Sequence, residues 1–480
     1  MKKPVIYWFR QDLRTYDLPG LAAALGSGRP VLACYIHDES AAGDWAPGGA
    51  SRWWLHHSLE SLGREIADLG GSLCLRSGDT ADVMEQLIAA TDADTVLCSR
   101  QYEPWAVELE NRLHESLDSA GVTLKRYPGT LLFEPGSVKT QADQPYKVFT
   151  PFWRACRALP QPPQPRGLPD ECQWLQEAPP SDALEDWALT PQQPDWAAGW
   201  ENLWQPGSDG ARRRLQEFLS EKAGNYSEGR DHPACDSTSR LSPHLHFGEI
   251  SPREIWHTAQ AHGAGSGANA REVDKFLSEL GWREFSYQLL VHFPDIPHAP
   301  FKQQFSHFPW SVKQQGLRAW QQGQTGYPVV DAGMRELWQT GYMHNRVRMV
   351  VASFLTKHLL IHWRAGEDWF WDTLLDADLA NNACSWQWVA GSGADAAPYF
   401  RIFNPVAQGE KFDRDGDYVR RWVPELAALP DKYLHHPWDA PADVLESAGV
   451  VLGQTYPEPV VDHRAAREAT LSAYAQIKGE

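Results

Sequence analysis

Two periodicities of apolar residues divide the chain. Over the first 130 residues, short runs of apolar and β-branched residues alternate with stretches in which apolar residues recur every three or four positions. This alternation of strand-like and helix-like segments predicts an α/β domain with a parallel five-stranded sheet. The predicted strands are Pro4–Phe9, Pro30–His37, Ser72–Arg76, Asp94–Arg100 and Thr123–Tyr127, and predicted helices include Leu55–Leu69 and Val107–Leu117.

The second half of the chain carries the helical periodicity. From about residue 207 onward apolar residues recur at helical spacing, as in Phe276, Leu280, Phe285 and Leu289. The stretch 160–206 is rich in Pro, Gln, Asp and Trp, which is typical of a long surface connector. We therefore predict an α/β domain over residues 1–130, an interdomain linker over 131–206 and an all-α domain over 207–480.

Simple patterns disfavour several kinds of protein. No Gly-x-Gly-x-x-Gly follows the first predicted strand, where Phe9–Asp12 stands instead, so a Rossmann-type dinucleotide site is not expected there. No apolar run approaches the roughly 20 residues that cross a bilayer, and the run after Lys3 is too short for a secretory signal. We expect a cytoplasmic protein without membrane association.

The seven cysteines are scattered at positions 34, 74, 98, 156, 172, 235 and 384, with no Cys-x-x-Cys pair. A disulfide scaffold, a zinc finger and an iron–sulfur cluster are therefore disfavoured, and no metal site is expected. Because the sequence shows no heptad seam or internal repeat, we expect a monomer without an obligate protein partner.

The net charge of −18, from 44 Lys and Arg against 62 Asp and Glu, argues at first against a nucleic-acid partner. Its distribution changes this picture. Residues 167–211 hold −9 and residues 431–480 hold −4, whereas the long segment 212–430 holds only −2. A locally basic face is therefore permitted within the helical domain.

One polar segment of the helical domain is suited to an anion. Thr238–Pro243 places three hydroxyls, several backbone N–H groups and one Arg at a predicted helix start. Hydroxyl and N–H donors at a helix start, together with a guanidinium, can bind a phosphate. An ordinary helix cap is the alternative interpretation.

Two predicted helix faces combine polar and apolar groups that could contact a base. Glu279, Trp282 and Arg283 lie at spacings of three and four and so share a face, where a carboxylate, a ring and a guanidinium could bind a base edge. A plain salt bridge between Glu279 and Arg283 is the simpler alternative. A second face carries Asn345, Arg348 and Met349, in a segment with His344 and Arg346.

A third segment gathers paired carboxylates, paired amides and two indole rings within thirteen residues. No His accompanies the acid pair, so a metal shell is poorly supported. The carboxylates and amides could instead accept hydrogen bonds from ribose hydroxyls or from ring N–H groups of a cofactor. The residues are Asp376, Asp378, Asn381, Asn382, Trp386 and Trp388.

In their order and spacing, these segments resemble the photolyase/cryptochrome flavoprotein family. The resemblance runs from Tyr7–Arg14 to Arg401–Pro405, over nearly the whole chain. The chain is most similar to the microbial enzymes that act on cyclobutane pyrimidine dimers, and Phe276–Pro294 and Trp105 suggest class III rather than class I. The resemblance implies an α/β antenna domain followed by a linker and a helical domain that binds FAD and DNA.

The activity implied by this resemblance is light-dependent repair of UV-damaged DNA, as a deoxyribodipyrimidine photo-lyase. Photoexcited reduced FAD would transfer one electron to a cyclobutane pyrimidine dimer flipped out of the DNA. Photolyases are a known example of base-flipping enzymes. The residues agree, because one-electron splitting of a cyclobutane needs neither a nucleophile nor a metal, and the sequence shows neither arrangement.

The resemblance also assigns residues to FAD. Asn382 would face N5 of the flavin and favour its reduced states. The positions that match phosphate contacts are Tyr226, Thr238, Ser239, Arg240, Leu241 and Ser242. The positions that match contacts to the ribityl chain and the isoalloxazine ring are Arg283, Arg348, Asp376, Asp378 and Asn382.

A lesion pocket and an electron chain are implied in the same way. Trp282 and Trp388 would stack on the dimer, and Glu279 would hydrogen-bond a thymine and stabilise its radical anion. The substrate-binding positions are Glu279, Trp282, Asn345, Arg346, Met349, Trp388 and Arg401. The catalytic positions are Glu279, Asn345, Asn382 and the electron chain Trp386, Trp363 and Trp310, with Trp386 nearest the flavin.

The antenna cofactor is where the chain departs most from the family. Pro104-Trp105-Ala106 stands where many members grip a folate with an Asn-Glu pair, and Tyr342 stands where many class I members have Trp. Trp105 could instead stack on a pterin ring, so 5,10-methenyltetrahydrofolate is the expected antenna. A deazaflavin, an empty site and a plain packing role for Trp105 stay open.

Other functions within the family compete with dimer repair. A cryptochrome-like blue-light receptor would bind flavin with little repair, but plant-type receptors usually carry Asp opposite flavin N5 and lack the lesion-stacking Trp, so Asn382 and Trp388 favour repair. An enzyme for six-four photoproducts is disfavoured because Met343–Arg346 lacks the expected His pair. A relative that prefers single-stranded DNA stays open.

Overall fold

The structure is a computed structural model that describes residues 2–264, 267–311, 314–395 and 400–478. Its contacts divide the chain into two compact units, each built from segments that are distant in sequence. The predicted boundaries at residues 130 and 206 stay predictions. The first unit comprises Met1–Gly224, Ser239–Pro294 and Leu375–Ala380, and the second comprises Asn225–Thr238, Asp295–Leu374 and Asn381–Glu480.

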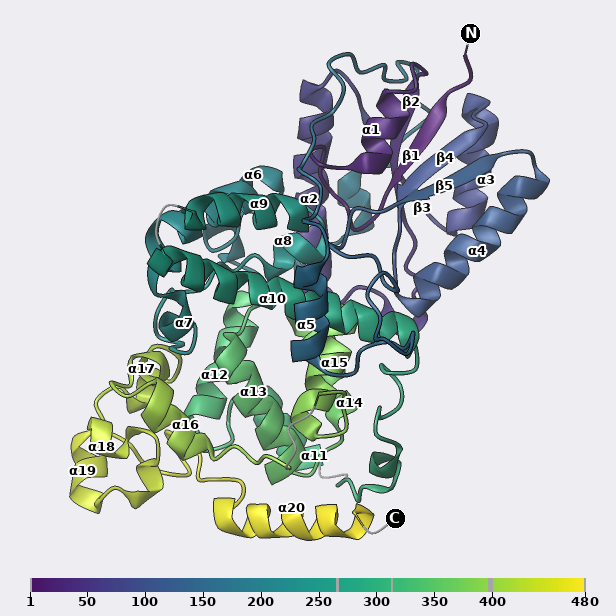
Figure 1. The fold of residues 1–480 in the computed structure, drawn as a ribbon. Coiled ribbons are helices and arrows are strands. Elements are labelled where there is room, and N and C mark those ends of the chain that lie inside the picture. The colour runs from purple at the N-terminus through teal and green to yellow at the C-terminus, as the bar shows by residue number, and fades with distance from the viewer. Residues whose placement is uncertain (1, 265–266, 312–313, 396–399, 479–480) are drawn as a thin grey trace. The chain divides into compact units, whose positions relative to one another are not determined.

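A five-stranded sheet lies within the first unit (Figure 1). The strands pair in the order β3-β2-β1-β4-β5, and all four pairs are parallel. The predicted parallel sheet is thus confirmed. The strands are β1 Val5–Phe9, β2 Val31–His37, β3 Leu73–Ser77, β4 Thr95–Ser99 and β5 Thr123–Tyr127.

β1 lies at the centre of the sheet, and all five of its residues are buried. Parallel strands covered on both faces are built from continuous apolar runs, and this sequence has them. Trp8 lies in register with Cys34 and Cys98, in a core closed by α3 (Thr80–Thr91) and α4 (Pro104–Ser119). α1 (Pro19–Leu25) and α2 (Gly49–Asp68) also contact the sheet.

The predicted linker is held in the first unit by its tryptophans. Trp174, Trp200 and Trp204 are buried, and Trp174 forms a parallel bridge with Val31. Although the linker is polar in overall composition, these large apolar side chains pack it into the core. The other helices of the first unit are α5 Phe149–Ala158, α6 Ser208–Glu217, α8 Ser242–His246, α9 Pro252–Gly263 and α10 Gly267–His292.

The second unit is helical, and its described residues contain no strand beyond isolated bridges. This confirms the predicted helical part of the chain. α15 (Leu379–Ala390) begins in the first unit and continues in the second. The others are α7 Tyr226–Gly229, α11 Gln314–Gln321, α12 Pro328–Thr340, α13 Asn345–Ser353, α14 Trp363–Thr373, α16 Pro405–Phe412, α17 Asp417–Trp422, α18 Asp431–Leu434, α19 Ala442–Ser447 and α20 His463–Ile477.

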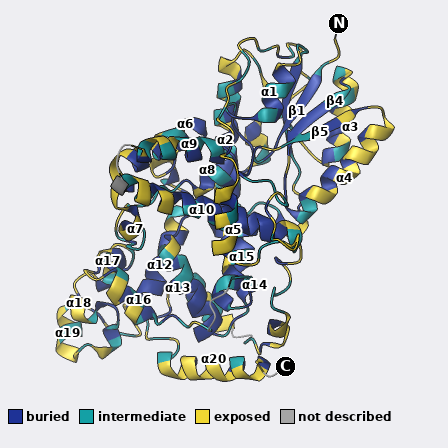
Figure 2. Ribbon diagram, viewed as in Figure 1, coloured by how far each residue is buried: buried dark blue, intermediate teal, exposed yellow. Residues whose placement is uncertain are grey.

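α20 shows how an amphipathic pattern selects one buried face. Ala466, Thr470, Ala473 and Ile477 recur at spacings of three and four and are buried, while most of the other residues of α20 are exposed (Figure 2). Among all the helices in the described part of the chain, none is long and apolar enough to cross a bilayer.

Candidate functional site

α14 and α15 carry two of the predicted electron-chain tryptophans. Trp363 opens α14, where the side chain of His362 accepts a hydrogen bond from the backbone N–H of Arg364 and caps the helix. Trp386 belongs to α15 and packs against α14. A Cβ on Gly366 would lie 2.0 Å from the Trp386 ring, so this approach requires glycine. Both indoles are almost fully buried.

The imidazole of His362 lies close to both Trp310 and Trp363. The ring centroids of Trp310 and His362 are 5.1 Å apart, and those of His362 and Trp363 are 5.2 Å apart. Burial, with the nearby charge of Arg364, lowers the pKa of His362 to about 4, so this imidazole is uncharged at neutral pH. Trp310 is half-buried. The three tryptophans therefore lie on or beside α14, with burial decreasing toward Trp310.

Asn382 is held by the backbone of α14. Its Nδ2 donates to the carbonyl oxygen of Glu367 at 3.1 Å. The Glu367 side chain is fully buried, and neither carboxyl oxygen has a hydrogen-bond partner among the described residues. Burial, followed by the charge of Asp368, raises the pKa of Glu367 well above its usual range. Sequence reasoning missed Glu367, because nothing in its spacing separates it from a surface glutamate.

A buried polar cluster in the first unit surrounds Asp378. The Tyr287 hydroxyl donates to Asp378 Oδ2, and His246 Nδ1 lies 3.9 Å from the same oxygen. Burial favours the neutral acid, but the nearby His246, the charge of Arg283 and the hydrogen bond from Tyr287 outweigh it and hold the pKa of Asp378 at about 2. Asp378 is therefore an anion at neutral pH, ready to accept hydrogen bonds.

Tyr287, His246 and Glu103 were missed by sequence reasoning. Burial and then the charge of Asp378 raise the pKa of Glu103, which is buried in the same unit. His246 follows the predicted phosphate segment by a few residues, and this was the only available signal. Asp376, the other predicted acid, is half-buried.

The three residues of the predicted face lie on α10, each with at least one close neighbour. Arg283 Nη1 donates to the Thr130 carbonyl at 2.9 Å and lies 3.4 Å from Glu284 Oε1. Glu279 lies 3.6 Å from Lys275. Trp282 stacks on Phe149, with ring centroids 3.7 Å apart.

The predicted phosphate segment bends sharply before α8. Arg240 adopts a left-handed conformation with φ of 49°. Leu241 occupies the N-cap position of α8 and makes no side-chain capping bond. At the N-cap position itself, therefore, no side chain forms the ordinary cap that was the alternative interpretation. The N–H-rich turn and its half-buried side chains stay compatible with an anion.

The start of α13 combines several predicted contacts in the second unit. His344 caps the helix, Asn345 is exposed and Met349 is half-buried. Arg346 pairs with Asp231 at 2.6 Å, and Arg348 Nε donates to a backbone carbonyl at 2.7 Å.

Burial, helped by the charges of nearby arginines and opposed by the charge of Asp231, lowers the pKa of His344 to about 3. Its imidazole is therefore neutral at ordinary pH.

The remaining predicted residues are divided between the units. Trp388 Nε1 donates to the Asp395 carbonyl at 3.0 Å, and Arg401 is exposed. Tyr226 is buried, and the Arg230 guanidinium lies 5.6 Å from its ring centroid. The first unit holds Trp105, Ser239, Arg240, Leu241, Ser242, Glu279, Trp282, Arg283, Asp376 and Asp378, and the second holds Tyr226, Thr238, Trp310, Asn345, Arg346, Arg348, Met349, Trp363, Asn382, Trp386, Trp388 and Arg401.

The α/β part has buried polar atoms of Arg10 near the point where the strand order reverses. Ligands of parallel sheets commonly bind at such a point, outside the carboxyl ends of the strands. Arg10 follows β1 there, pairs with Glu110 at 2.6 Å and lies over the Trp8 ring, but its Nε and Nη1 are buried without a hydrogen-bond partner among the described residues. Trp105 lies near the start of α4, half-buried and packed against the sheet core.

Comparisons with known proteins match both ends of the chain to one family. Residues 5–170 match the family described as DNA photolyase, and residues 276–476 match the FAD binding domain of DNA photolyase. The chain is 50% identical over 475 residues to a deoxyribodipyrimidine photo-lyase of Agrobacterium fabrum, covering 99% of this chain and 98% of that protein. It is 37% identical over 480 residues to Cryptochrome-1 of Arabidopsis thaliana, covering 98% of this chain and 70% of that protein.

A solved structure shows the same fold over the whole length. A bacterial class III photolyase from Agrobacterium tumefaciens superposes with a TM-score of 0.96 at 49% identity, covering 100% of this chain and 98% of the other. A cryptochrome of Synechocystis gives a TM-score of 0.89 at 30% identity, covering 98% of this chain and 100% of the other.

Proposed function

The chain belongs to the photolyase/cryptochrome family, and on that premise we propose that it is a deoxyribodipyrimidine photo-lyase, a light-dependent enzyme that splits cyclobutane pyrimidine dimers in DNA. The observation that carries this function is the 50% identity to a photolyase of that name over 99% of the chain. FAD is the cofactor, because the family's FAD-binding domain spans residues 276–476.

Unpaired polar atoms in the second unit support a buried polar ligand. Both carboxyl oxygens of Glu367, Nε2 of His344 and Nε1 of Trp386 are buried without a hydrogen-bond partner among the described residues. Buried polar atoms are rarely unpaired in a folded protein, so a bound group or water would complete this region. The residues that would hold FAD are Tyr226, Thr238, Ser239, Arg240, Leu241, Ser242, Arg283, Arg348, Asp376, Asp378 and Asn382.

When bound, reduced FAD excited by blue light would supply the single electron needed to open the cyclobutane ring. Residues of the chain orient the side chains of the proposed FAD site. Asn382 presents its carboxamide in one orientation because Glu367 accepts its Nδ2–H. Asp378 stays ionised and accepts a hydrogen bond from the Tyr287 hydroxyl, with His246 Nδ1 3.9 Å away, so it can accept further hydrogen bonds without reorganising.

We assign lesion binding to Trp282, Trp388 and Glu279. Trp282 is fixed by its stack on Phe149, and Trp388 by its bond to Asp395, so each ring is oriented before substrate binds. Stacking contributes roughly 1–3 kcal/mol per base and offsets part of the cost of unstacking, which is lower for a damaged base. The other proposed lesion or phosphate contacts are Asn345, Arg346, Met349 and Arg401.

We assign photoreduction of the flavin to Trp386, Trp363 and Trp310. The half-buried Trp310 can be re-reduced from solution, and the buried Trp363 and Trp386 relay the electron inward. The neutral His362 between Trp310 and Trp363 adds no positive charge that would oppose an oxidised indole.

We also propose that the antenna is 5,10-methenyltetrahydrofolate, stacked on Trp105. The half-buried indole and the unpaired nitrogens of Arg10 in the same α/β part support a bound ring with polar edges. A near-ultraviolet absorption band in purified protein that disappears in Trp105→Ala, with flavin retained, is the expected result. Retention of the band would favour plain packing for Trp105.

Damaged DNA is the proposed partner, and we propose a cytoplasmic monomer. The defining experiment illuminates pre-reduced, FAD-loaded protein with blue light on dimer-containing oligonucleotides, as duplex and as single strand. Restoration of thymines is expected on the duplex, and repair limited to single strands would redefine the substrate. Bound flavin without any repair would instead favour a receptor function, which the 37% identity to Cryptochrome-1 makes the second candidate.

A further inference from the structure

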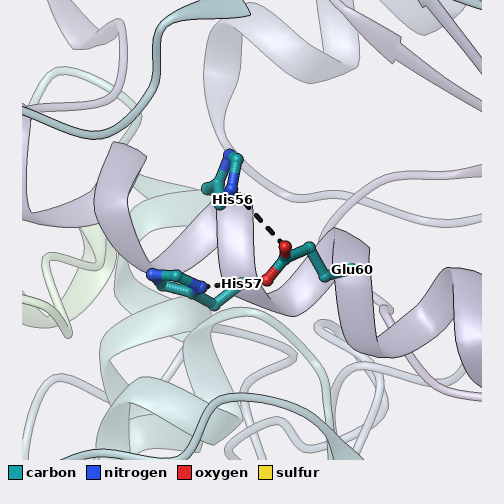
Figure 3. Close-up of side chains that lie close together, drawn as sticks. All are labelled: His56, His57 and Glu60. Carbon is teal, nitrogen blue, oxygen red and sulfur yellow. Dashed lines mark hydrogen bonds and ion pairs between the residues drawn. The ribbon is translucent and has the colours of Figure 1, made fainter. Parts of the chain in front are cut away.

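α2 carries three metal-ligand side chains that the flavin chemistry does not use. His56, His57 and Glu60 gather on one side of this helix, because Glu60 follows His56 by four residues and His57 by three (Figure 3). Their donor atoms all lie within 4.8 Å of one another. Within the described ranges, no other group of three His, Cys, Asp or Glu residues meets this condition.

The separations suit a first-row transition ion. His57 Nδ1 is 3.0 Å from Glu60 Oε2, and His56 Nε2 is 3.8 Å from Glu60 Oε1. Two ligands at about 2.0–2.2 Å from a tetrahedral Zn²⁺ are roughly 3.3–3.5 Å apart, between these two values. Two imidazoles and one carboxylate, with water in the remaining position, are a frequent zinc ligand set.

The packing of the two imidazoles restricts their movement. The His56 ring is half-buried, and its Nε2 lies on the side of Glu60, 3.8 Å from Oε1. His57 is held by the edge of Trp53, with centroids 4.6 Å apart, and Trp53 is itself buried against Trp200. A ring that is already held loses little freedom on binding.

One side of the cluster is open to solvent. The side chains of Glu60 and His57 are 40% and 32% exposed, so an ion and its water ligands can enter. We propose that His56, His57 and Glu60 bind one divalent transition-metal ion of the zinc class. The ion would tie two successive turns of α2, the helix that also supplies Trp53 and Trp54 to the core of the first unit. The simpler alternative is a carboxylate that accepts hydrogen bonds from two imidazoles.

Equilibrium dialysis of the FAD-loaded protein against Zn²⁺ tests the site. We expect one ion per chain, and Glu60→Gln should weaken binding about tenfold or more because it removes the anionic ligand at constant size. His436→Gln is the matched control. His436 lies 3.7 Å from Glu410 and 3.3 Å from Asp439, yet belongs to no three-ligand group among the described residues, so this variant should bind like wild type.

A second readout separates metal binding from folding. Zn²⁺ should raise the melting temperature of wild type and of His436→Gln but not that of Glu60→Gln or His57→Gln. Circular dichroism and the melting temperature without metal show whether the variants fold. Absence of bound Zn²⁺ in wild type, or equal binding by folded Glu60→Gln, would overturn the proposal.

Discussion

At the scale of single residues, Glu367 shows how burial sets charge. Its side chain is 0% exposed, and its carboxyl group has no hydrogen-bond partner among the described residues. Burial and then the charge of Asp368 raise its pKa well above 4.5, so the folded protein holds the proton on this group more tightly than the unfolded chain does. Folding must therefore take up a proton at this position.

Glu367→Gln should consequently be more stable than wild type, and increasingly so as the pH rises. Because the folded-state pKa is raised, the contribution of Glu367 is full below its unfolded pKa near 4.5 and falls above it by up to about 1.4 kcal/mol per pH unit. The free energy of unfolding of FAD-loaded protein at pH 5 to 8 checks this. The exposed Glu108→Gln should show no such trend, and a pH-independent difference for Glu367→Gln would contradict the prediction.

Trp363→Phe should block photoreduction while sparing repair. The substitution keeps a ring in the buried site but removes the indole proposed to relay the electron between Trp310 and Trp386, so oxidised flavin should be photoreduced much more slowly. Protein reduced chemically beforehand should repair dimers at nearly the wild-type rate. Flavin absorption under illumination and thymine restoration give the two rates.

Trp369→Phe is the matched control, because Trp369 lies on the same helix but is half-buried and stacks on Trp338. It should leave both rates unchanged. Equal losses of photoreduction and repair in Trp363→Phe would refute the division of roles.

Single residues also show which side-chain contacts could be predicted from the sequence and which could not. Helical spacing could place Glu279, Trp282 and Arg283 on one face, because three- and four-residue spacing depends only on local geometry. It could not give the partner of Arg283, since that carbonyl, on Thr130, lies 153 residues away. The bond from Asn382 to Glu367 was hidden for the same reason, because it depends on how two helices pack.

At the scale of elements, the strands were predictable to within one or two residues. Parallel strands buried on both faces need apolar runs that polar turns interrupt, and these runs are visible in the sequence. The irregular helical turns could not be predicted from the sequence. Phe354–His358 forms a π-helical turn after α13, and an apolar run such as Val347–Leu355 looks the same whether or not its hydrogen bonds shift by one residue.

The contact between α14 and α15 makes a prediction at this scale. Gly366→Ala would place a methyl group 2.0 Å from the Trp386 ring, which small movements cannot relieve. Overpacking costs about 1–3 kcal/mol and exceeds the helix-propensity gain of roughly 0.5–1 kcal/mol, so the variant should lose stability and photoreduce more slowly.

Gly63→Ala on α2 is the matched control, because nothing lies within 4 Å of its added methyl group. It should gain about 0.5–1 kcal/mol. Thermal melting of the two variants checks both signs. A Gly366→Ala protein as stable as wild type would show that the two helices can separate without cost.

At the scale of the whole molecule, the charge of −18 must be reconciled with DNA binding. Most of it lies in 167–211 and 431–480, so the total says little about the proposed DNA-contacting residues. The structure adds a restraint that the sequence did not reveal. Arg346, a proposed DNA contact, is paired with Asp231 at 2.6 Å and lies over the Phe412 ring at 4.4 Å. One of the cations proposed for phosphate binding is therefore already partly neutralised.

Releasing that cation should strengthen DNA binding without changing its specificity. Asp231→Asn leaves Arg346 free to contact a phosphate, so affinity for damaged and undamaged duplex should rise by the same factor, and the slope of log K against log salt should steepen by roughly 0.9. Fluorescence polarisation over a salt series measures both. Asp439→Asn, which alters an acid paired with His436, should change neither. A gain confined to damaged DNA would make Arg346 a lesion contact, and an unchanged slope would exclude it from phosphate binding.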